Sequence, residues 1–298
     1  MDRATHRMRV LRPDENILAF YDGRIEGYRF AEGSNWVDEG ALSLGIASYA
    51  IVDDGQALVY DTHVSVDRAR FIRQALEERG VSKFTVVLSH WHLDHVAGTE
   101  AFRDCEVIAS ARTAQLLTGN RAAIENGSLE GPPWIDPLIL PTRTFAGRER
   151  LDLGATEVDL IQVNIHSDDA TVIWLPQQRL LLCGDTMEDT ITYVDEPEAF
   201  EAHLADLERL WELGPDRILP SHGDPDVIAA GGYPRELIRA TQQYIEVLKR
   251  CRDEPHLRDA PLRELIAGPL EAGWVRYFPP YDAVHRENLE TALDPDSS

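Results

Sequence analysis

Four potential metal ligands lie within six positions of the sequence, in the segment SHWHLDHV at residues 89–96. This segment follows an almost continuous apolar stretch, FTVVL, which is typical of a strand covered on both faces. The four residues are His90, His92, Asp94 and His95. Neutral imidazole nitrogens and carboxylate oxygens are the ligands that Zn²⁺ and similar cations take in proteins. The segment therefore predicts a metal site rather than a polar turn.

Three further candidate ligands follow other apolar segments of the chain. His166 follows DLIQVN, Asp185 follows RLLLC, and His222 follows RILPS. Ligand-binding side chains gather at the carboxyl ends of strands in α/β folds. A single histidine in such a place is more typical of a capping or core residue. Because ligand-type residues follow four different strands here, we predict one shared metal site.

The segments around these residues predict a layered α/β domain, in which sheets are sandwiched between helices. Helical spacing of apolar residues covers 66–79, 197–213 and 234–252, and the first of these ends at Gly80, a suitable C-cap. Both halves of the chain run from strands to a helix and then to a strand that ends in a polar loop. Residues 126–144 are predicted to be an irregular surface loop. The strand-like segments are 16–23, 43–55, 57–62, 83–88, 156–163, 170–175, 179–185 and 217–220.

The composition limits the class of function. The 298 residues include 52 acidic and 29 basic ones, which gives a formal net charge of −23. This excess repels phosphate backbones and anionic membrane surfaces, so we expect a small-molecule substrate, no nucleic-acid partner and no membrane. The three cysteines are far apart and odd in number, which does not indicate a disulfide framework, and the N-terminus lacks the apolar run of a signal peptide. A cytoplasmic location follows as an expectation.

The chain shows no repeat and no linker-like segment, so we predict a single domain over 1–298. Its core would span 17–225, and a helical and irregular C-terminal wrap would span 233–298. Within this wrap, the aromatic and proline-rich residues 273–288 could cap the active site or form a homodimer contact, but a structural role is the simpler expectation. The isolated histidines are predicted to lie on the surface; these are His6, His203, His256 and His285.

HWHLDH resembles the HxHxDH motif of the metallo-β-lactamase superfamily. His166, the Gly-Asp pair ending at Asp185 and the Ser-His-Gly around His222 are similar to further motifs of that family, in the same order. The resemblance covers roughly residues 17–225. It implies a four-layer αβ/βα sandwich of two mixed sheets flanked by helices, with metals at the rim between the sheets. The pattern is most similar to hydroxyacylglutathione hydrolases and lactonases of the family.

The resemblance also implies two metal sites. The expected cofactors are two divalent ions, with Zn²⁺ the best match to this set of ligands and Fe or Mn also suited. In β-lactam-hydrolysing members with a cysteine ligand, a cysteine stands in place of the bridging aspartate. Cys183 is instead interpreted as a buried strand residue. Carried over by position, the first site would be His90, His92 and His166, and the second Asp94, His95 and His222, with Asp185 bridging the two.

Two cations that share a water molecule can lower its pKa from about 15.7 toward about 7. The predicted activity is therefore hydrolysis of a small thioester, ester, lactone or amide by a metal-bridging hydroxide, with Asp94 as a catalytic residue that orients the water or takes its proton. Trp36 and Tyr193 are candidate substrate-binding residues. Lactonases of this pattern have a tyrosine three residues after the bridging aspartate, where this chain has Glu188, which argues against a lactonase.

Three alternatives remain open on the sequence. A mononuclear iron dioxygenase that acts on a persulfide shares several of these ligands. A hydrolase of small phosphodiesters belongs to the same superfamily and is compatible with the charge of the chain. A metal-bearing effector that binds a ligand without turnover is the third, and the complete set of ligands argues against it.

Overall fold

Seven strands form the first sheet in the computed structural model, which describes residues 7–293. They lie in the order β1-β2-β3-β4-β5-β6-β7, antiparallel from β1 to β4 and parallel from β4 to β7. The strands are β1 Arg9–Asp14, β2 Ile17–Asp22, β3 Ile46–Asp53, β4 Gln56–Tyr60, β5 Lys83–Val87, β6 Glu106–Ser110 and β7 Arg143–Phe145.

Six strands of the same described part form the second sheet, in the order β13-β12-β11-β10-β9-β8. Its neighbours are antiparallel except β11 and β12, which are parallel. Both sheets are therefore mixed, as predicted. The strands are β8 Arg148–Leu153, β9 Thr156–Gln162, β10 Thr171–Leu175, β11 Leu180–Gly184, β12 Arg217–Pro220 and β13 Tyr233–Pro234.

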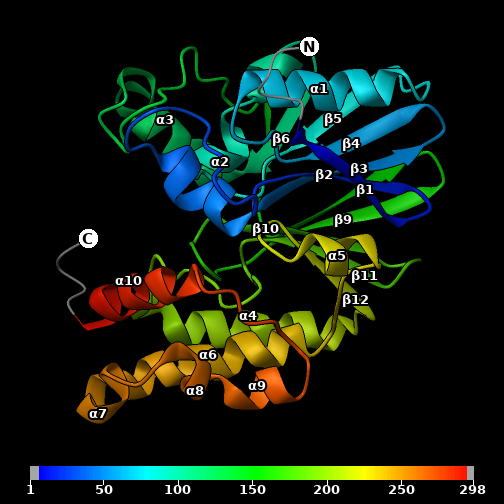
Figure 1. The fold of residues 1–298 in the computed structure, drawn as a ribbon. Helices are drawn as coiled ribbons and strands as arrows, with labels where there is room; N and C mark the ends of the chain where they lie inside the picture. Colours follow the sequence, from blue (N-terminus) through cyan, green and yellow to red (C-terminus); the bar gives the residue numbers. More distant parts are fainter. Residues whose placement is uncertain (1–6, 294–298) are drawn as a thin grey trace.

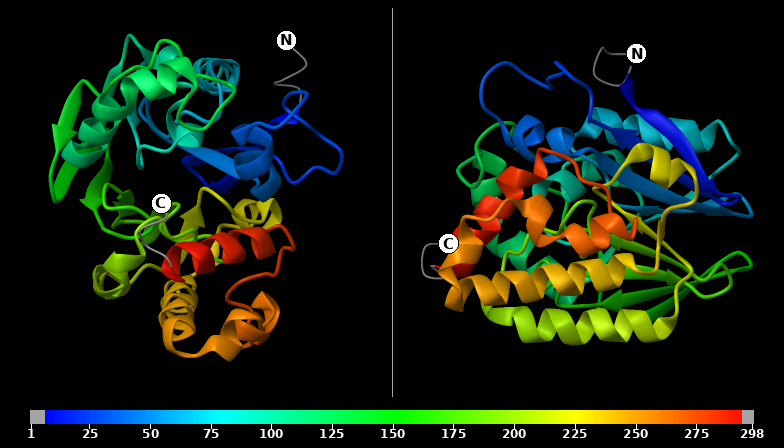
Figure 2. Two further views of the ribbon diagram at one scale, coloured as in Figure 1. Left: turned by 90° about the vertical axis from the view of Figure 1, so that its left-hand side faces the viewer. Right: turned by 60° about the horizontal axis from the view of Figure 1, so that its bottom comes forward.

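Helices cover the outer face of each sheet. Figures 1 and 2 show α1 and α3 against the first sheet and α4 and α6 against the second. The helices are α1 Val66–Glu77, α2 Leu93–Val96, α3 Ala111–Asn126, α4 Phe200–Leu213, α5 Pro225–Ala229, α6 Leu237–Asp253, α7 Pro255–Arg258, α8 Leu262–Leu265, α9 Ala267–Glu271 and α10 Tyr281–Leu293, with the short π- or 3₁₀-helices η2 Val37–Leu42, η3 Thr99–Phe102 and η4 Pro197–Ala199. None of these helices has both the length and the apolar character needed to cross a membrane.

Helix α1 shows why these layers form. Ser65 caps its N-terminus, since its side chain accepts a hydrogen bond from the backbone N–H of Arg68. Ala69, Ile72 and Leu76 recur at helical spacing and are buried against the first sheet. The burial of this apolar face drives the helix onto the sheet.

Tyrosine hydroxyls join the two sheets across the core. Tyr21 in β2, Tyr49 in β3 and Tyr60 in β4 are each fully buried. Tyr49 and Tyr60 donate hydrogen bonds to the carbonyl oxygens of Pro220 and Thr171 in the second sheet, and Tyr21 donates one to the carbonyl of Gly223 just beyond it. The first sheet thereby fixes strand ends that carry candidate ligands.

The predicted fold class is confirmed, while several elements were not foreseen. The alternating charges of β8 (RERLDL) and the weak apolar face of α3 hide both elements from pattern reading. The irregular loop was predicted well, because α3 ends at Asn126 and β7 begins at Arg143.

The surface placement of two histidines is wrong, because both are buried as hydrogen-bonded core residues. His203 donates from Nδ1 to the carbonyl of Asn164, and the Nδ1 of His285 lies 2.9 Å from the Tyr244 hydroxyl. His256 is exposed, as predicted, and His6 lies outside the described residues.

Candidate metal centre

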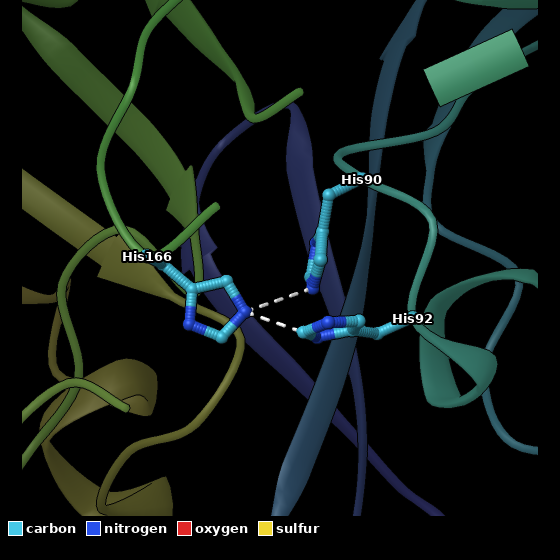
Figure 3. A group of neighbouring side chains, drawn as sticks. All are labelled: His90, His92 and His166. Atoms are coloured by element: carbon cyan, nitrogen blue, oxygen red, sulfur yellow. Dashed lines mark hydrogen bonds between the residues drawn. The ribbon is translucent and has the colours of Figure 1, made fainter. Parts of the chain in front are cut away.

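Three imidazole rings converge at the first group of candidate ligands, as Figure 3 shows. His90 and His92 come from the loop between β5 and α2, and His166 comes from the loop between β9 and β10. The Nε2 atom of His166 lies 3.2 Å from His90 Nε2 and 3.1 Å from His92 Nδ1. Nitrogens about 2.0–2.1 Å from one tetrahedral ion are roughly 3.3 Å from each other. The spacing of the three nitrogens fits such an ion.

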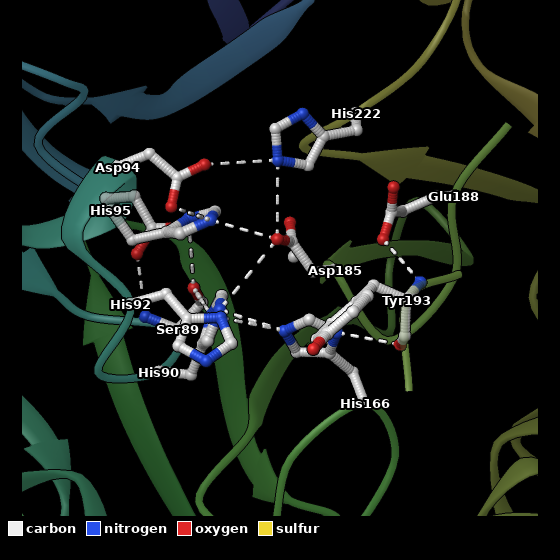
Figure 4. Close-up of polar contacts among 12 residues, drawn as sticks. Ser89, His90, His92, Asp94, His95, His166, Asp185, Glu188, Tyr193 and His222 are labelled. Carbon is white, nitrogen blue, oxygen red and sulfur yellow. Dashed lines mark hydrogen bonds and ion pairs between the residues drawn. The ribbon is translucent and has the colours of Figure 1, made fainter. Parts of the chain in front are cut away.

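The second group consists of two carboxylates and two imidazoles from three separate segments of the chain. Its members are Asp94, His95, Asp185 and His222. Asp94 and His95 lie on α2. Asp185 directly follows β11, and His222 lies in the loop after β12. Figure 4 shows the four side chains pointing toward one another. Asp94 Oδ2 lies 3.2 Å from His222 Nε2, and Asp185 Oδ2 lies 3.0 Å from His95 Nε2 and 3.3 Å from His222 Nε2.

Asp185 connects the two groups. Its Oδ2 atom, which contacts the second group, also lies 3.8 Å from His90 Nε2 of the first. Its other oxygen, Oδ1, is buried and has no hydrogen-bond partner among the described residues. An unpaired buried carboxylate oxygen is costly unless a cation neutralises it. The residues present therefore fit divalent ions at this place.

Asp61 contacts His95 at the ring nitrogen that faces away from the candidate ligands, and it was not foreseen as part of the site. Its Oδ2 lies 2.9 Å from His95 Nδ1, and its Oδ1 accepts a hydrogen bond from the backbone N–H of Ser89. A carboxylate on the far nitrogen of a ligating histidine fixes the ring and raises its basicity. The sequence does contain a signal, because Asp61 directly follows strand β4 just as the other ligands follow theirs.

The other candidate histidines are also held through the ring nitrogen that faces away from the group. His166 Nδ1 donates to the carbonyl of Tyr193 at 2.9 Å, and His222 Nδ1 donates to the carbonyl of Gly45 at 2.8 Å. His92 Nε2 lies 3.7 Å from a carboxylate oxygen of Asp195. The far nitrogens of His166 and His222 are thus hydrogen-bonded, and that of His92 faces a carboxylate. This leaves His166 Nε2, His222 Nε2 and His92 Nδ1 to bind a cation.

The electrostatics differ within the first group as well as between the groups. Burial opposes protonation of His92, but the carboxylate of Asp195 outweighs it and raises the pKa of His92 to about 9. Burial lowers the pKa of His90 well below its ordinary value and that of His166 to about 4, so both imidazoles are neutral near pH 7. Burial also opposes protonation of His95 and His222, but the nearby carboxylates outweigh it and raise the pKa of both. Without a cation, protons stabilise the carboxylates of the second group, and a divalent ion would displace them.

Both groups face one cavity of about 420 Å³. The side chains of His92, Asp94, His166, Asp185 and His222 form part of its wall. A site with an accessible cavity beside the ligands leaves room for water and substrate, as catalytic metal sites require.

The two predicted substrate contacts, Trp36 and Tyr193, also line this cavity. Their role as substrate contacts stays a prediction. Trp36 is held in place by a hydrogen bond from its indole N–H to the carbonyl of Pro133, within the irregular loop. Cys183 is buried in β11 as predicted.

The C-terminal helix supplies part of the cavity wall, which was the less favoured of the roles considered for this segment. Val284 and Glu287 of α10 line the cavity opposite the ligands, together with Pro280 just before the helix. Glu188 lines it as well and is only 2% exposed. Tyr281 donates a hydrogen bond to Glu188 at 2.9 Å. The segment expected to be a structural wrap therefore lines the candidate site.

The model of one protein family, the metallo-beta-lactamase superfamily, matches residues 44–222, the part of the chain that carries all seven candidate ligands. The chain belongs to the metallo-beta-lactamase superfamily. Solved structures of this superfamily share its fold. The metallo-beta-lactamase from Hirschia baltica has a TM-score of 0.57 at 16% identity and covers 80% of this chain and 97% of its own. The structure of VMB-1 has a TM-score of 0.60 at 15% identity and covers 81% of this chain and 98% of its own.

Curated relatives of similar sequence have names that indicate different functions. A linear primary-alkylsulfatase from Pseudomonas sp. is 24% identical over 274 residues, covering 75% of this chain and 50% of the relative. A hydroxyacylglutathione hydrolase from Cereibacter sphaeroides is 32% identical over 124 residues, covering 42% of each. A beta-lactamase-like protein 2 homolog from Drosophila melanogaster is 26% identical over 156 residues, covering 50% and 48%. The chain thus spans about half the length of these superfamily relatives.

Proposed function

We propose that the protein is a hydrolase with two divalent metal ions, most simply Zn²⁺, that cleaves a small thioester, ester, lactone or amide. The observation that carries this proposal is the arrangement of seven ligand-type residues in two groups joined by Asp185. Superfamily relatives that are hydrolases by name, such as the hydroxyacylglutathione hydrolase of Cereibacter sphaeroides, support the reaction class.

Divalent ions at the two groups would polarise a carbonyl oxygen and lower the pKa of a nearby water molecule toward neutrality. The chain itself supplies Asp94, whose side chain is 17% exposed and lines the cavity. Its carboxylate can hold a water molecule in position and accept its proton. The rings of His92 and His166 form a fixed part of the cavity wall beside the first group of ligands, against which the substrate carbonyl can be oriented.

The completeness of the second group favours this proposal over a mononuclear iron dioxygenase. A single ion would need only His90, His92 and His166 with one more ligand. The chain also places Asp94, His95 and His222 around the bridging carboxylate, and Asp61 orients one of them. The cytoplasmic location and the homodimer contact stay predictions from the sequence.

Metal content and activity together test the proposal. Elemental analysis of freshly purified protein is expected to find two zinc-like ions per chain, and a panel of thioesters, esters, lactones and amides should include a substrate. His90→Ala should lose metal and activity, while His256→Ala, which changes an exposed histidine far from the groups in sequence, should lose neither. One iron per chain, or a metal-loaded protein inactive on the whole panel, would overturn the proposal.

A further inference from the structure

The cavity beside the candidate metal centre has a strongly acidic wall. Beyond the candidate ligands, four glutamates line it: Glu39, Glu130, Glu188 and Glu287. They come from η2, from the irregular loop, from the segment after β11 and from α10, so four separate parts of the chain contribute a carboxylate each. Glu188 is buried, whereas Glu39, Glu130 and Glu287 are exposed to solvent. A ligand that covers these carboxylates removes them from water, which is costly unless the ligand itself carries a positive charge.

These four carboxylates lack cationic partners. Within residues 7–293, none of them lies at ion-pair distance from an Arg, Lys or His side chain, although the chain forms many such pairs elsewhere. None of the described residues that line the cavity is Lys or Arg. Burial raises the pKa of Glu188 to about 7, with the charge of Asp185 adding to the effect, and burial beside Glu290 raises that of Glu287. In the described part of the chain, no basic side chain therefore neutralises this wall, and a cation bound there would favour the charged form of these carboxyl groups.

Aromatic rings complete the wall. Trp36, Trp91 and Tyr193 line the same cavity. The ring of Trp91 lies 5.5 Å from that of His92, and the ring of Tyr193 lies 5.9 Å from that of His166, so both aromatic residues adjoin the first group of candidate ligands. Aromatic faces attract cations, above all amines and quaternary ammonium groups. Carboxylates and aromatic rings thus line the same cavity that the candidate metal ligands face.

We propose that the natural substrate is a carbonyl compound that carries a positively charged nitrogen beside an apolar group and has no carboxylate, sulfate or phosphate. This inference rests on the proposed hydrolase function and names its substrate class. The ammonium group lies among the aromatic rings and Glu188 or Glu287 while the carbonyl faces the metal groups. Away from the two metal groups, an anionic substituent would meet carboxylates and no Lys or Arg, so the wall also acts against substrates that carry one there.

Three matched thioesters test the charge preference on the metal-loaded protein. They are acetylthiocholine, its neutral isostere with a tert-butyl group in place of the trimethylammonium group, and a thioester of the same length that ends in a carboxylate. A second series places the same three groups on the acyl side of the thioester. In at least one series we expect kcat/KM to be at least tenfold higher for the cation than for the neutral isostere, and lowest for the anion.

Single substitutions test whether the glutamates of the wall cause the preference for the cationic substrate. Glu188→Gln and Glu287→Gln are expected to reduce the ratio of kcat/KM between the cationic and neutral substrates at least threefold, while Glu290→Gln should keep it. Glu290 is an exposed glutamate on the same helix as Glu287 that does not line the cavity. Because the ratio is taken within each variant, partial loss of metal or of folded protein cancels out.

The outcomes separate this inference from the proposed function. Hydrolysis without preference for the cation in both series, or with preference for the anion, overturns the inference and leaves the hydrolase intact. No hydrolysis of any thioester counts against the proposed function, and calorimetry with non-hydrolysable ketone isosteres then tests the wall alone. Tighter binding of the cationic ketone than of the neutral one, lost in Glu188→Gln, supports the cationic ligand, whereas equal binding overturns it.

Discussion

The hydroxyl of Tyr281 donates a hydrogen bond of 2.9 Å to Glu188, although 93 residues separate them in the chain. Tyr281 begins α10, and Glu188 lies three residues after the bridging Asp185. Asn288, further along α10, strengthens the link by accepting a bond from the N–H of Val194 and donating to the carbonyl of Thr192. The C-terminal helix is thus fastened to the loop that carries a candidate metal ligand.

Loss of this hydrogen bond should loosen the C-terminal wall. Tyr281→Phe leaves a buried carboxylate with one donor fewer, which should lower the free energy of unfolding by about 1–3 kcal/mol. Tyr277→Phe is the matched control, because its hydroxyl contacts Asp282 outside the cavity. Urea denaturation measures both. A loss of stability in Tyr277→Phe as large as in Tyr281→Phe would contradict a special role for the Glu188 contact.

Asp61 should affect metal affinity at the second group, and Asp195 should affect it at the first. Asp61→Asn removes the charge beside His95, and asparagine tolerates the left-handed backbone at this position (φ 65°). We expect roughly 10–100-fold weaker binding at the second group, whereas Asp195→Asn should weaken the first group through His92. Chelator competition measures both ions. Unchanged affinity in both variants would show that neither carboxylate orients a ligand.

Glu188 should make the stability of the metal-free protein depend on pH. Its pKa is raised by burial from 4.5 to about 7, so between these values the folded protein binds more protons than the unfolded chain. The free energy of unfolding should therefore fall as the pH rises from about 4.5 to about 7, by up to roughly 3 kcal/mol from this group. Glu188→Gln should gain stability relative to wild type across this range, and denaturation at several pH values checks it. A constant difference would contradict the shift.

A buried ion pair beneath α1 should be essential for folding. Arg68 Nη2 lies 2.6 Å from Asp22 Oδ2, and both side chains are fully buried. Arg68→Met leaves the carboxylate of Asp22 without its cation, which should cost about 3–5 kcal/mol. Arg70→Met breaks only solvent-accessible pairs, with Asp67 and Glu100, and should change the melting temperature little. Equal effects of the two substitutions would show that the buried pair is not special.

The sequence alone determined the fold class and the set of candidate ligands. Each ligand directly follows a strand or begins a short helix, so its position is set by a few neighbouring residues. Apolar strands such as FTVVL and RLLLC have strong local patterns, and HWHLDH places four ligand-type side chains in one turn. These features depend on nearby residues in the chain, which is why pattern reading reaches them.

Only the tertiary structure decided what surrounds those ligands. Asp61, Glu188 and Tyr281 take part in the site through contacts between segments up to 93 residues apart, and no local pattern encodes such distances. The burial of His203 and His285 has the same origin, since His203 donates a hydrogen bond to the carbonyl of Asn164 and His285 contacts Tyr244, both distant in the chain. The sequence shows which groups can bind metal, whereas the packing of α10 and the loops decides which charge and shape of substrate can reach them.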